Sequence, residues 1–249
     1  TGILLMANFA YMSGTGNNFL VGEYDGPVSE IQIVALVSDA EIEVDGVIFV
    51  EPLDDSTVIM HYFNNDGSDA ELCVNGVRCV ARYAVDNNYI NLNNFVVVAP
   101  VSDIKVSVQD NNIEIQAPIP TFENIPIQFN EYKGIKSQVG NPHFLVQVDD
   151  VSNANLVKLK DLVEELNIFD NGFNLEIYQI IDNKYIKARV FERGVGETDA
   201  CGSGALCLFN YLYKTEQIKN DSYVLYPGGD LNLKFKNDNL LLSGDVIYL

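Results

Sequence analysis

A cysteine-containing segment occurs twice in the chain, and this repeat constrains the fold more than any other feature. Cys73-Val-Asn-Gly-Val-Arg-Cys79 aligns with Cys201-Gly-Ser-Gly-Ala-Leu-Cys207 at an offset of 128 residues. Phe63 and Phe191 each stand ten residues before the first cysteine of their segment. Two further matches keep the same order along the chain, Pro100–Asp103 with Pro227–Asp230 and Gly16–Val21 with Gly140–Val146. Collinear matches of this kind indicate two related halves.

The periodicity of apolar residues predicts the same elements in both halves. A helix with one buried face follows each first cysteine, because apolar residues recur there at i, i+3, i+4 and i+7. These residues are Val77, Val80, Ala81 and Ala84, and then Ala205, Leu208, Phe209 and Leu212. Two more helices are predicted at 30–38 and 155–166. Runs typical of strands cover 46–51, 57–63, 95–99, 104–109, 113–117, 144–148, 175–181, 185–191, 231–235 and 240–242.

These elements predict an α+β fold of two pseudo-symmetric domains, each a mostly antiparallel sheet wrapped around a central helix. Prolines between Pro118 and Pro126 are typical of a linker, so the predicted domains are 6–118 and 132–249. Met6 is interpreted as the native first residue, with residues 1–5 a foreign remnant.

Charge and cysteine content exclude several classes of protein. With 35 acidic and 15 basic residues, the net charge of −20 repels a polyanion, so no nucleic-acid partner is expected. No apolar run is long enough for a membrane span, and the first residues do not form a secretory signal. Four cysteines are too few for a disulfide scaffold and do not have zinc-ribbon spacing. We expect reduced thiols, no metal and a cytoplasmic location.

The position of Cys73 and Cys201 before a helix predicts acid/base chemistry. The positive end of a helix dipole favours a thiolate, and the unpaired N–H groups there bind a carboxylate. Two such sites facing each other across an interdomain cleft would place one sulfur on each side of a substrate Cα. One thiolate would remove the α-proton and the other thiol would deliver a proton to the opposite face. No pyridoxal, P-loop or dinucleotide signature is present, so no cofactor is expected.

Other candidate residues allow structural interpretations. Cys79 and Cys207 lie within the helices and are interpreted as buried core thiols. For His143, in Gly-Asn-Pro-His, structural and functional roles remain equally open. Glu192 and Arg193 are compatible with a solvated charge pair at a strand end.

Four segments of the chain resemble the diaminopimelate epimerase family. They are Gly14-Thr-Gly-Asn-Asn-Phe19, Phe63-Asn-Asn-Asp-Gly-Ser68, Gly140-Asn-Pro-His143, and Glu192-Arg-Gly-Val-Gly-Glu-Thr198 leading into Ala200-Cys-Gly-Ser-Gly-Ala205. Tyr226-Pro-Gly-Gly229 extends the likeness. The Glu192 segment is the most specific, since racemases of the proline racemase type share the cysteine pair but are not expected to carry Glu192-Arg193-Gly194 in this form.

The resemblance implies interconversion of LL- and meso-2,6-diaminoheptanedioate, a step toward lysine and peptidoglycan precursors, by a cytoplasmic homodimer. It implies that Cys73 and Cys201 are the acid/base thiols and that His143 and Glu192 tune their pKa values. The residues that it assigns to substrate binding are Asn17, Asn64, Val74, Asn75, Asn141, Asn174, Glu192, Arg193, Gly202 and Ser203. A carboxylate and a guanidinium match the ammonium and carboxylate at the distal end of this substrate.

The chain departs from the family pattern at three positions. Val74 stands where glycine is usual, and a β-branched residue disfavours positive φ. Asn18 replaces a usual aspartate, and Gly46 a glutamine that some members have. Three alternatives stay open: a racemase of the same fold with another amino acid, a non-catalytic ligand-binding descendant, and a cysteine hydrolase that uses Cys73 with His143.

Overall fold

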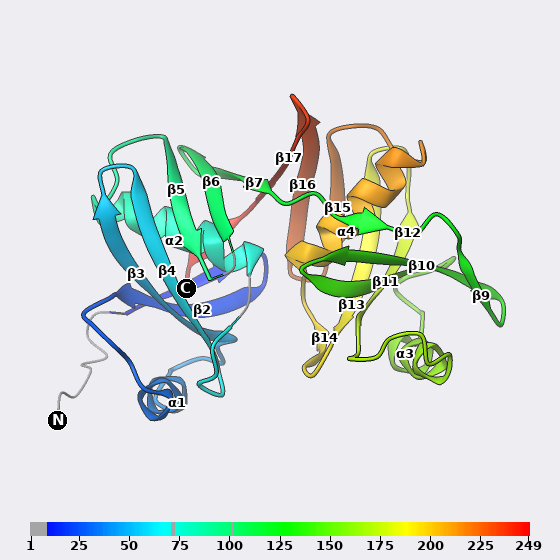
Figure 1. Cartoon of the computed structure of the whole chain (residues 1–249), viewed down its shortest axis with the longest axis horizontal. Coiled ribbons are helices and arrows are strands. Elements are labelled where there is room, and N and C mark those ends of the chain that lie inside the picture. Colours follow the sequence, from blue (N-terminus) through cyan, green and yellow to red (C-terminus); the bar gives the residue numbers. More distant parts are fainter. Residues whose placement is uncertain (1–8, 71–72, 101) are drawn as a thin grey trace. The chain divides into compact units, whose positions relative to one another are not determined.

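The computed structural model describes residues 9–70, 73–100 and 102–249. The chain forms two compact units (Figure 1). Of the described residues, those up to 116 together with 243–249 form the first unit, and residues 117–242 form the second.

The elements of the first unit are β1 (Ala10–Gly14), β2 (Asn17–Glu23), α1 (Glu30–Ser38), β3 (Gly46–Asp54), β4 (Thr57–Asn64), α2 (Val74–Asp86), β5 (Asn94–Ala99), β6 (Ser102–Gln109), β7 (Asn112–Ala117) and β18 (Val246–Tyr248). Those of the second unit are β8 (Thr121–Phe122), β9 (Ile127–Phe129), β10 (Tyr132–Val139), β11 (Asn141–Gln147), α3 (Leu156–Glu165), β12 (Asn174–Ile180), β13 (Tyr185–Glu192), β14 (Gly196–Thr198), α4 (Gly202–Lys214), β15 (Ser222–Tyr226), β16 (Gly229–Lys236) and β17 (Asn239–Gly244).

The two units repeat the same strand pairings in the same register. Strands β2 and β3 pair in parallel with Phe19 opposite Gly46, and β11 and β12 pair in parallel with His143 opposite Asn174. The parallel pair β4–β5 likewise corresponds to β13–β15. The neighbouring pairs β3–β4, β5–β6, β12–β13 and β15–β16 are antiparallel. The predicted α+β fold with two pseudo-symmetric, mostly antiparallel halves is therefore confirmed.

A central helix fills the interior of each unit. Helices α2 and α4 are both 13 residues long, and most of their residues are buried because strands contact them from several sides. Each begins directly after its cysteine, as the sequence predicts. The helices predicted at 30–38 and 155–166 are also present, as α1 and α3. Asn155 and Leu166 flank α3, and the Asn155 side chain accepts from the Lys158 N–H at 3.0 Å.

The two units differ in extent from the predicted domains 6–118 and 132–249. The stretch 118–132 contains β8 and β9, which pair with β10, so it is part of the second sheet rather than a linker. Residues 243–249 return to the first unit, where β18 pairs with β1 and places Met12 opposite Tyr248. This pairing satisfies the backbone groups along that side of β1. The predicted start at Met6 and the remnant 1–5 lie outside the described residues.

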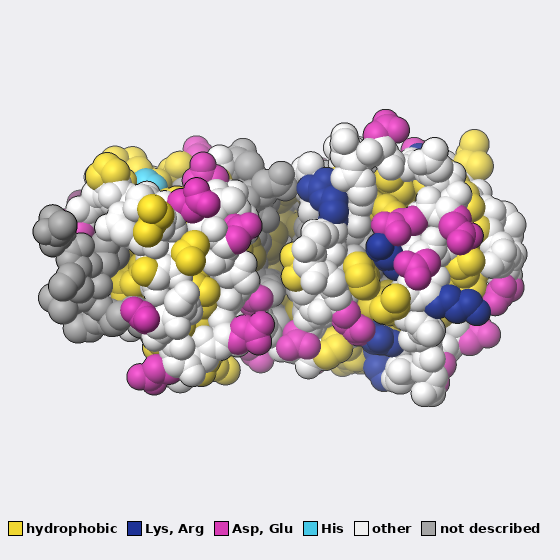
Figure 2. All heavy atoms as spheres, turned by 90° about the horizontal axis from the view of Figure 1, so that it is seen from below, with side chains coloured by type: hydrophobic (Ala, Val, Ile, Leu, Met, Phe, Trp, Pro, Cys, Tyr) yellow, Lys and Arg dark blue, Asp and Glu magenta, His cyan; other side chains and the backbone are white. Residues whose placement is uncertain are grey.

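The acidic residues belong to both units, whereas the basic residues are concentrated in the second. Of the 15 Lys and Arg residues, only Arg78, Arg82 and Lys105 precede residue 117. In Figure 2 the Lys and Arg side chains lie over the half of the picture that holds the second unit, among acidic side chains. None of the helices in the described ranges has the length and apolar character needed to cross a membrane.

One close contact between neighbouring strands allows a test of core packing. A Cβ atom on Gly134 in β10 would lie 2.0 Å from Cζ of Phe144, which is fully buried in β11. The Phe144 ring packs on Phe129, Phe169 and Phe173 and has no room to move. We expect Gly134→Ala to lower the free energy of unfolding by about 1–3 kcal/mol.

Urea denaturation of four proteins measures this effect: the parent, Gly134→Ala, Phe144→Leu and the double variant. The smaller leucine should accept the extra methyl group, so Gly134→Ala should cost less in the Phe144→Leu background. An equal loss of unfolding free energy on Gly134→Ala in the parent and in the Phe144→Leu protein would contradict the contact between Gly134 and Phe144.

Candidate active site

Both repeat cysteines are the N-cap residues of the central helices. Cys73 is half-buried, and its sulfur accepts from the Gly76 N–H at 3.4 Å. Cys201 is 5% exposed, and its sulfur accepts from the Gly204 N–H at 3.3 Å. The predicted placement of each sulfur at a helix N-terminus is confirmed.

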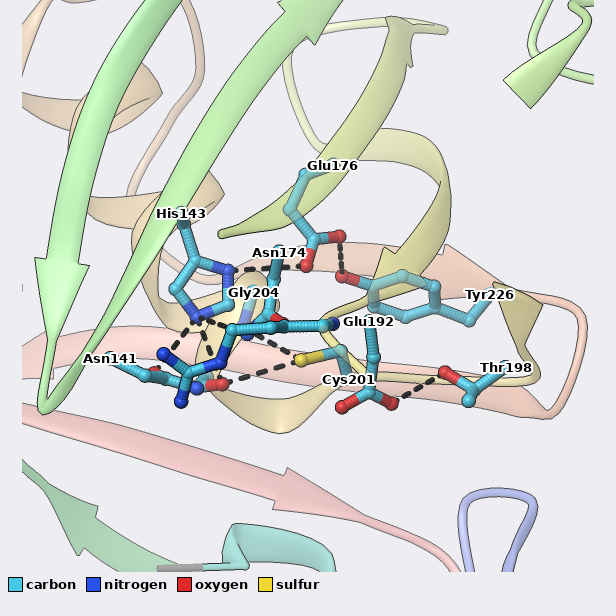
Figure 3. Close-up of polar contacts among 11 residues, drawn as sticks. Asn141, His143, Asn174, Glu176, Glu192, Thr198, Cys201, Gly204 and Tyr226 are labelled. Carbon is cyan, nitrogen blue, oxygen red and sulfur yellow. Dashed lines mark hydrogen bonds and ion pairs between the residues drawn. The ribbon is translucent and has the colours of Figure 1, made fainter. Parts of the chain in front are cut away.

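In the second unit, Cys201 belongs to a network of polar side chains (Figure 3). Its sulfur lies 3.3 Å from the Ser203 hydroxyl. Nε2 of His143 lies 3.1 Å from that hydroxyl and 3.1 Å from Oδ1 of Asn141. Asn174 approaches the same nitrogen at 3.5 Å. Because β11 and β12 pair in parallel with His143 opposite Asn174, the sheet brings these two side chains beside the start of α4.

The end of β13 adds the charged residues of the predicted site. Asn174 accepts from the backbone N–H of Arg193 at 2.8 Å, which fixes the turn after β13. The Arg193 guanidinium donates to the Asn171 carbonyl at 3.0 Å. Glu192 accepts from the Thr198 hydroxyl at 2.5 Å. Glu192 and Arg193 therefore have defined partners within the second unit, and Glu192 lies close enough to act electrostatically on Cys201.

Two residues of this network were missed by the sequence analysis. Glu176 is fully buried in β12, with Oε1 3.4 Å from Nδ1 of His143. The Tyr226 hydroxyl donates to Oε2 of Glu176 at 2.8 Å. A Cβ on Gly204 would lie 1.8 Å from Oε1 of Glu176, so this carboxylate packs directly against the first turn of α4. The one signal in the sequence is that Glu176 is the only charged residue of β12, which marks the residue but does not identify its partners.

Burial decides the protonation state of Cys201. Burial first, and then the charges of Glu192 and Glu176, raise the pKa of this thiol well above its ordinary value. Hydrogen bonds from Ser203 and the Gly204 N–H act in the opposite direction but are smaller. The expectation that the helix N-terminus favours a thiolate is thus outweighed at Cys201, because a charge is disfavoured in a dry environment beside carboxylates.

The other two cysteines are core thiols, as their helical positions predict. Cys79 and Cys207 are fully buried in α2 and α4. Burial raises the pKa of Cys79 to about 12 and also raises the pKa of Cys207. Both side chains therefore remain protonated at neutral pH.

In the first unit, a second polar group surrounds the start of α2. Asn75 donates from Nδ2 to Oδ1 of Asn17 at 2.5 Å, and Asn17 donates to Asp45 at 3.4 Å. Asn64 instead bonds within its own turn, to the Ser68 hydroxyl at 3.0 Å and the Asp69 carbonyl at 3.4 Å. Asn17 and Asn75 are thus brought together, whereas the side chain of Asn64 makes local hydrogen bonds.

Val74 fits its position without backbone strain. It is the first residue of α2, it is 3% exposed, and it is not among the described residues with positive φ. The valine that replaces the usual glycine therefore does not require a left-handed conformation. Its N–H group belongs to the first turn, where backbone donors have no partner within the helix.

A buried guanidinium lies beneath the same turn. Arg78 is fully buried, donates to the Thr15 hydroxyl at 2.6 Å and approaches the Val74 carbonyl at 3.5 Å. Burial lowers the pKa of Arg78 to about 10, while Cys79, Cys73 and Asp245 oppose that shift. The group stays charged at neutral pH, so the first unit holds a buried positive charge close to its cysteine.

One group in the described ranges has the composition of a metal site. It consists of His143, Glu176 and Cys201, which each offer a donor atom within 4.8 Å of the others. These are the same buried residues that form the Cys201 network. The sequence predicts no metal, and this group is the only one of its kind in the described part of the chain.

Comparisons with known proteins agree with this architecture. The sequence model described as diaminopimelate epimerase matches residues 9–118 and 136–248. A diaminopimelate epimerase of Brachyspira hyodysenteriae is 32% identical, with 97% of this chain and 96% of that protein covered. One of Thermotoga maritima is 34% identical, with 94% and 96% covered.

Solved structures share the fold at lower sequence identity. A phenazine biosynthesis PhzF-family protein of Enterococcus faecalis has a TM-score of 0.76 at 15% identity, with 97% of this chain and 96% of that chain covered. A hydroxyproline epimerase of Agrobacterium vitis has a TM-score of 0.68 at 12% identity, with 97% and 90% covered. The family match and the two relatives above 30% identity confirm the resemblance seen in the sequence, and the chain belongs to the diaminopimelate epimerase family of isomerases.

Proposed function

We propose that this chain interconverts LL- and meso-2,6-diaminoheptanedioate without a cofactor, with Cys73 and Cys201 as its acid and base. The observation that carries the proposal is that both sulfurs cap a buried helix N-terminus, in a chain of this family. The relatives named above are diaminopimelate epimerases, which supports this substrate. The step would supply lysine and peptidoglycan precursors, and we expect it in the cytoplasm, carried out by a homodimer.

The reaction moves two protons at one carbon. A thiolate removes the α-proton from one face of the substrate, and the other thiol gives its proton to the opposite face. The roles exchange in the reverse direction. Negative charge that develops on the α-carboxylate is held by N–H groups of Val74, Asn75, Gly202 and Ser203, which belong to the first turns of α2 and α4.

The remaining predicted residues would bind the distal amino-acid group. Arg193 matches its carboxylate and Glu192 its ammonium. The asparagines Asn17, Asn64, Asn141 and Asn174 would supply amide donors and acceptors. His143 and Glu192 would tune the thiols. Support for this assignment comes from the Cys201 network, in which Asn141, His143 and Asn174 are already in contact.

Each of the three alternatives is disfavoured by a separate argument. A non-catalytic descendant was motivated by Val74, which adopts its position without positive φ. A cysteine hydrolase that pairs Cys73 with His143 is disfavoured because Nε2 of His143 lies within 3.1 Å of Ser203, two residues after the other cysteine. A racemase for an amino acid without a distal charged group would leave Glu192 and Arg193 without a role in recognition.

Removal of either sulfur should abolish inversion. We expect Cys73→Ala and Cys201→Ala each to lower the rate of epimerisation by about 10²–10⁴-fold or more, the usual contribution of an acid/base group. The assay incubates meso-diaminopimelate in deuterated water and follows deuterium at Cα together with the LL isomer.

Cys79→Ala and Cys207→Ala are matched controls, since each removes a core thiol from the same helix as a proposed catalytic one. Their turnover should stay within about threefold of the parent, because neither group acts on substrate. Substantial inversion by Cys73→Ala or Cys201→Ala would refute the two-thiol mechanism. Absence of exchange in the parent protein with reduced thiols would refute the proposed substrate.

The pH dependence of alkylation tests the protonation of Cys201. Only the thiolate reacts, so carbamidomethylation by iodoacetamide should rise about tenfold per pH unit and show no plateau below the ordinary thiol pKa of 9.0. Peptide mass spectrometry separates Cys201 from the other cysteines. A plateau at or below neutral pH would show a resting thiolate instead.

The same shift has a consequence for stability. The folded state keeps the Cys201 proton at pH values where the unfolded chain loses it. The contribution of this thiol to stability is therefore complete below pH 9.0 and declines as the pH rises above it.

A further inference from the structure

The internal repeat provides a control for the buried polar residues around Cys201, because the matching strand registers give three of them a structural counterpart in the first unit. Glu176 lies opposite Leu145 in the β11–β12 pair, and Ile48 lies opposite Val21 in the equivalent β2–β3 pair. The third residue after each cysteine is a glycine, Gly76 after Cys73 and Gly204 after Cys201. A Cβ atom at Gly204 would contact Oε1 of Glu176, and a Cβ atom at Gly76 would contact Cδ1 of Ile48. Glu176 and Ile48 therefore occupy equivalent positions.

The partners of Glu176 have apolar counterparts as well. His143 corresponds to Phe19, since they lie opposite Asn174 and Gly46 in the same register. Tyr226 corresponds to Ala99. Tyr226 pairs with Gly229 at the β15–β16 turn, and Ala99 pairs with Ser102 at the equivalent β5–β6 turn. Phe19, Ile48 and Ala99 are all buried. The fold thus forms this layer from apolar side chains in one unit, so the polar group Glu176, His143 and Tyr226 is not required by the architecture.

A buried polar group that the fold does not require carries a cost in stability. A carboxylate taken out of water loses its hydration, and only good partners offset that loss. Glu176 has one hydrogen bond, from Tyr226 at 2.8 Å, and a longer charge contact with His143 at 3.4 Å. Such an arrangement is retained most readily where it serves a reaction.

The geometry connects Glu176 to Cys201 by two routes (Figure 3). Through space, its charge faces the sulfur across the first turn of α4, against which Oε1 packs. Through His143, it faces Nδ1 while Nε2 contacts Ser203, and the Ser203 hydroxyl contacts the sulfur at 3.3 Å. The contact between Oε1 of Glu176 and Nδ1 of His143 is an ion-pair contact without a hydrogen bond, so Glu176 acts on the imidazole as a neighbouring charge.

We propose that Glu176 is a positioning residue of the epimerase site, which holds His143 in register with Ser203 and keeps the resting proton on Cys201. This rests on the proposed function for its catalytic consequence. Cys201 then starts as the proton donor, and after it gives its proton to Cα, its thiolate is a stronger base for the return reaction. The groups that face Cys201 from the neighbouring elements are His143 on β11, Glu176 on β12, Glu192 on β13 and Tyr226 on β15, together with Ser203 on α4.

Glu176→Gln tests the proposal because it removes the charge and keeps the shape. The pKa of Cys201 should fall, so its alkylation at pH 8 should become about tenfold faster, which corresponds to one pKa unit. For the epimerase reaction we expect kcat to fall about tenfold with KM within about twofold, since the change affects proton transfer rather than substrate binding. Glu176→Asp, which keeps the charge, should retain slow alkylation.

Glu165→Gln is the matched control, because it removes an exposed carboxylate from α3 in the same unit. Its alkylation profile and turnover should equal those of the parent. The second variant is Glu176→Ile, since isoleucine is the residue that the first unit has at this position. It should give the same acceleration of Cys201 alkylation as Glu176→Gln.

The outcomes separate the two proposals. Faster Cys201 alkylation in a folded Glu176→Gln or Glu176→Ile protein supports the role of Glu176, even if the parent shows no turnover with diaminopimelate, which would refute only the proposed substrate. An unchanged alkylation profile overturns the proposal. Failure of both variants to fold, judged by circular dichroism, also overturns it, because Glu176 would then be a structural residue.

Discussion

The N-terminus of a helix enclosed by a sheet is the constraint on which both units depend. The first N–H groups of any helix lack intrahelical partners, and burial removes the water that would otherwise satisfy them. In each unit a cysteine sulfur accepts one of these groups, from Gly76 in α2 and from Gly204 in α4. The other backbone N–H groups of this first turn then point toward the space beside the sulfur. The same backbone geometry that closes the core thus places a thiol next to backbone N–H groups of the kind that bind anions.

Close packing around these turns explains the glycines that follow the cysteines. Side chains from the sheet reach the helix backbone at the third residue after each cysteine, where a Cβ would meet Ile48 in one unit and Glu176 in the other. The contact at Gly204 is the closer of the two, because a carboxylate there must approach both His143 and the helix. At Gly204 the neighbouring side chain leaves no space for a Cβ, whereas at Gly76 the contact is only tight, and neither glycine is needed for the backbone conformation because neither has positive φ.

The repeat made most of the fold predictable, and strands without a simple pattern account for what was missed. The spacing of apolar residues located α2 and α4, the helices predicted at 30–38 and 155–166 are present as α1 and α3, and α1 was predicted with its bounds. Strands β1 and β2 were not predicted, because Asn17, Asn18 and Gly22 interrupt the apolar pattern of β2. At the site, the sulfurs and their helix positions were predictable from one motif. Glu176 was not, because its partners come from β11 and β15, and only the folded sheet brings them together.

Burial also explains why the electrostatics of the site differ from what a helix N-terminus alone predicts. A dipole and a few N–H groups favour a thiolate by a modest amount, whereas loss of water and two nearby carboxylates disfavour it more strongly at Cys201. The buried charge of the first unit has the opposite sign, since it is the guanidinium of Arg78. The equivalent position of the second unit holds the buried Leu206. Each unit therefore carries a buried charge that its counterpart lacks. A pseudo-symmetric fold can in this way surround two sulfurs at equivalent positions with different electric fields.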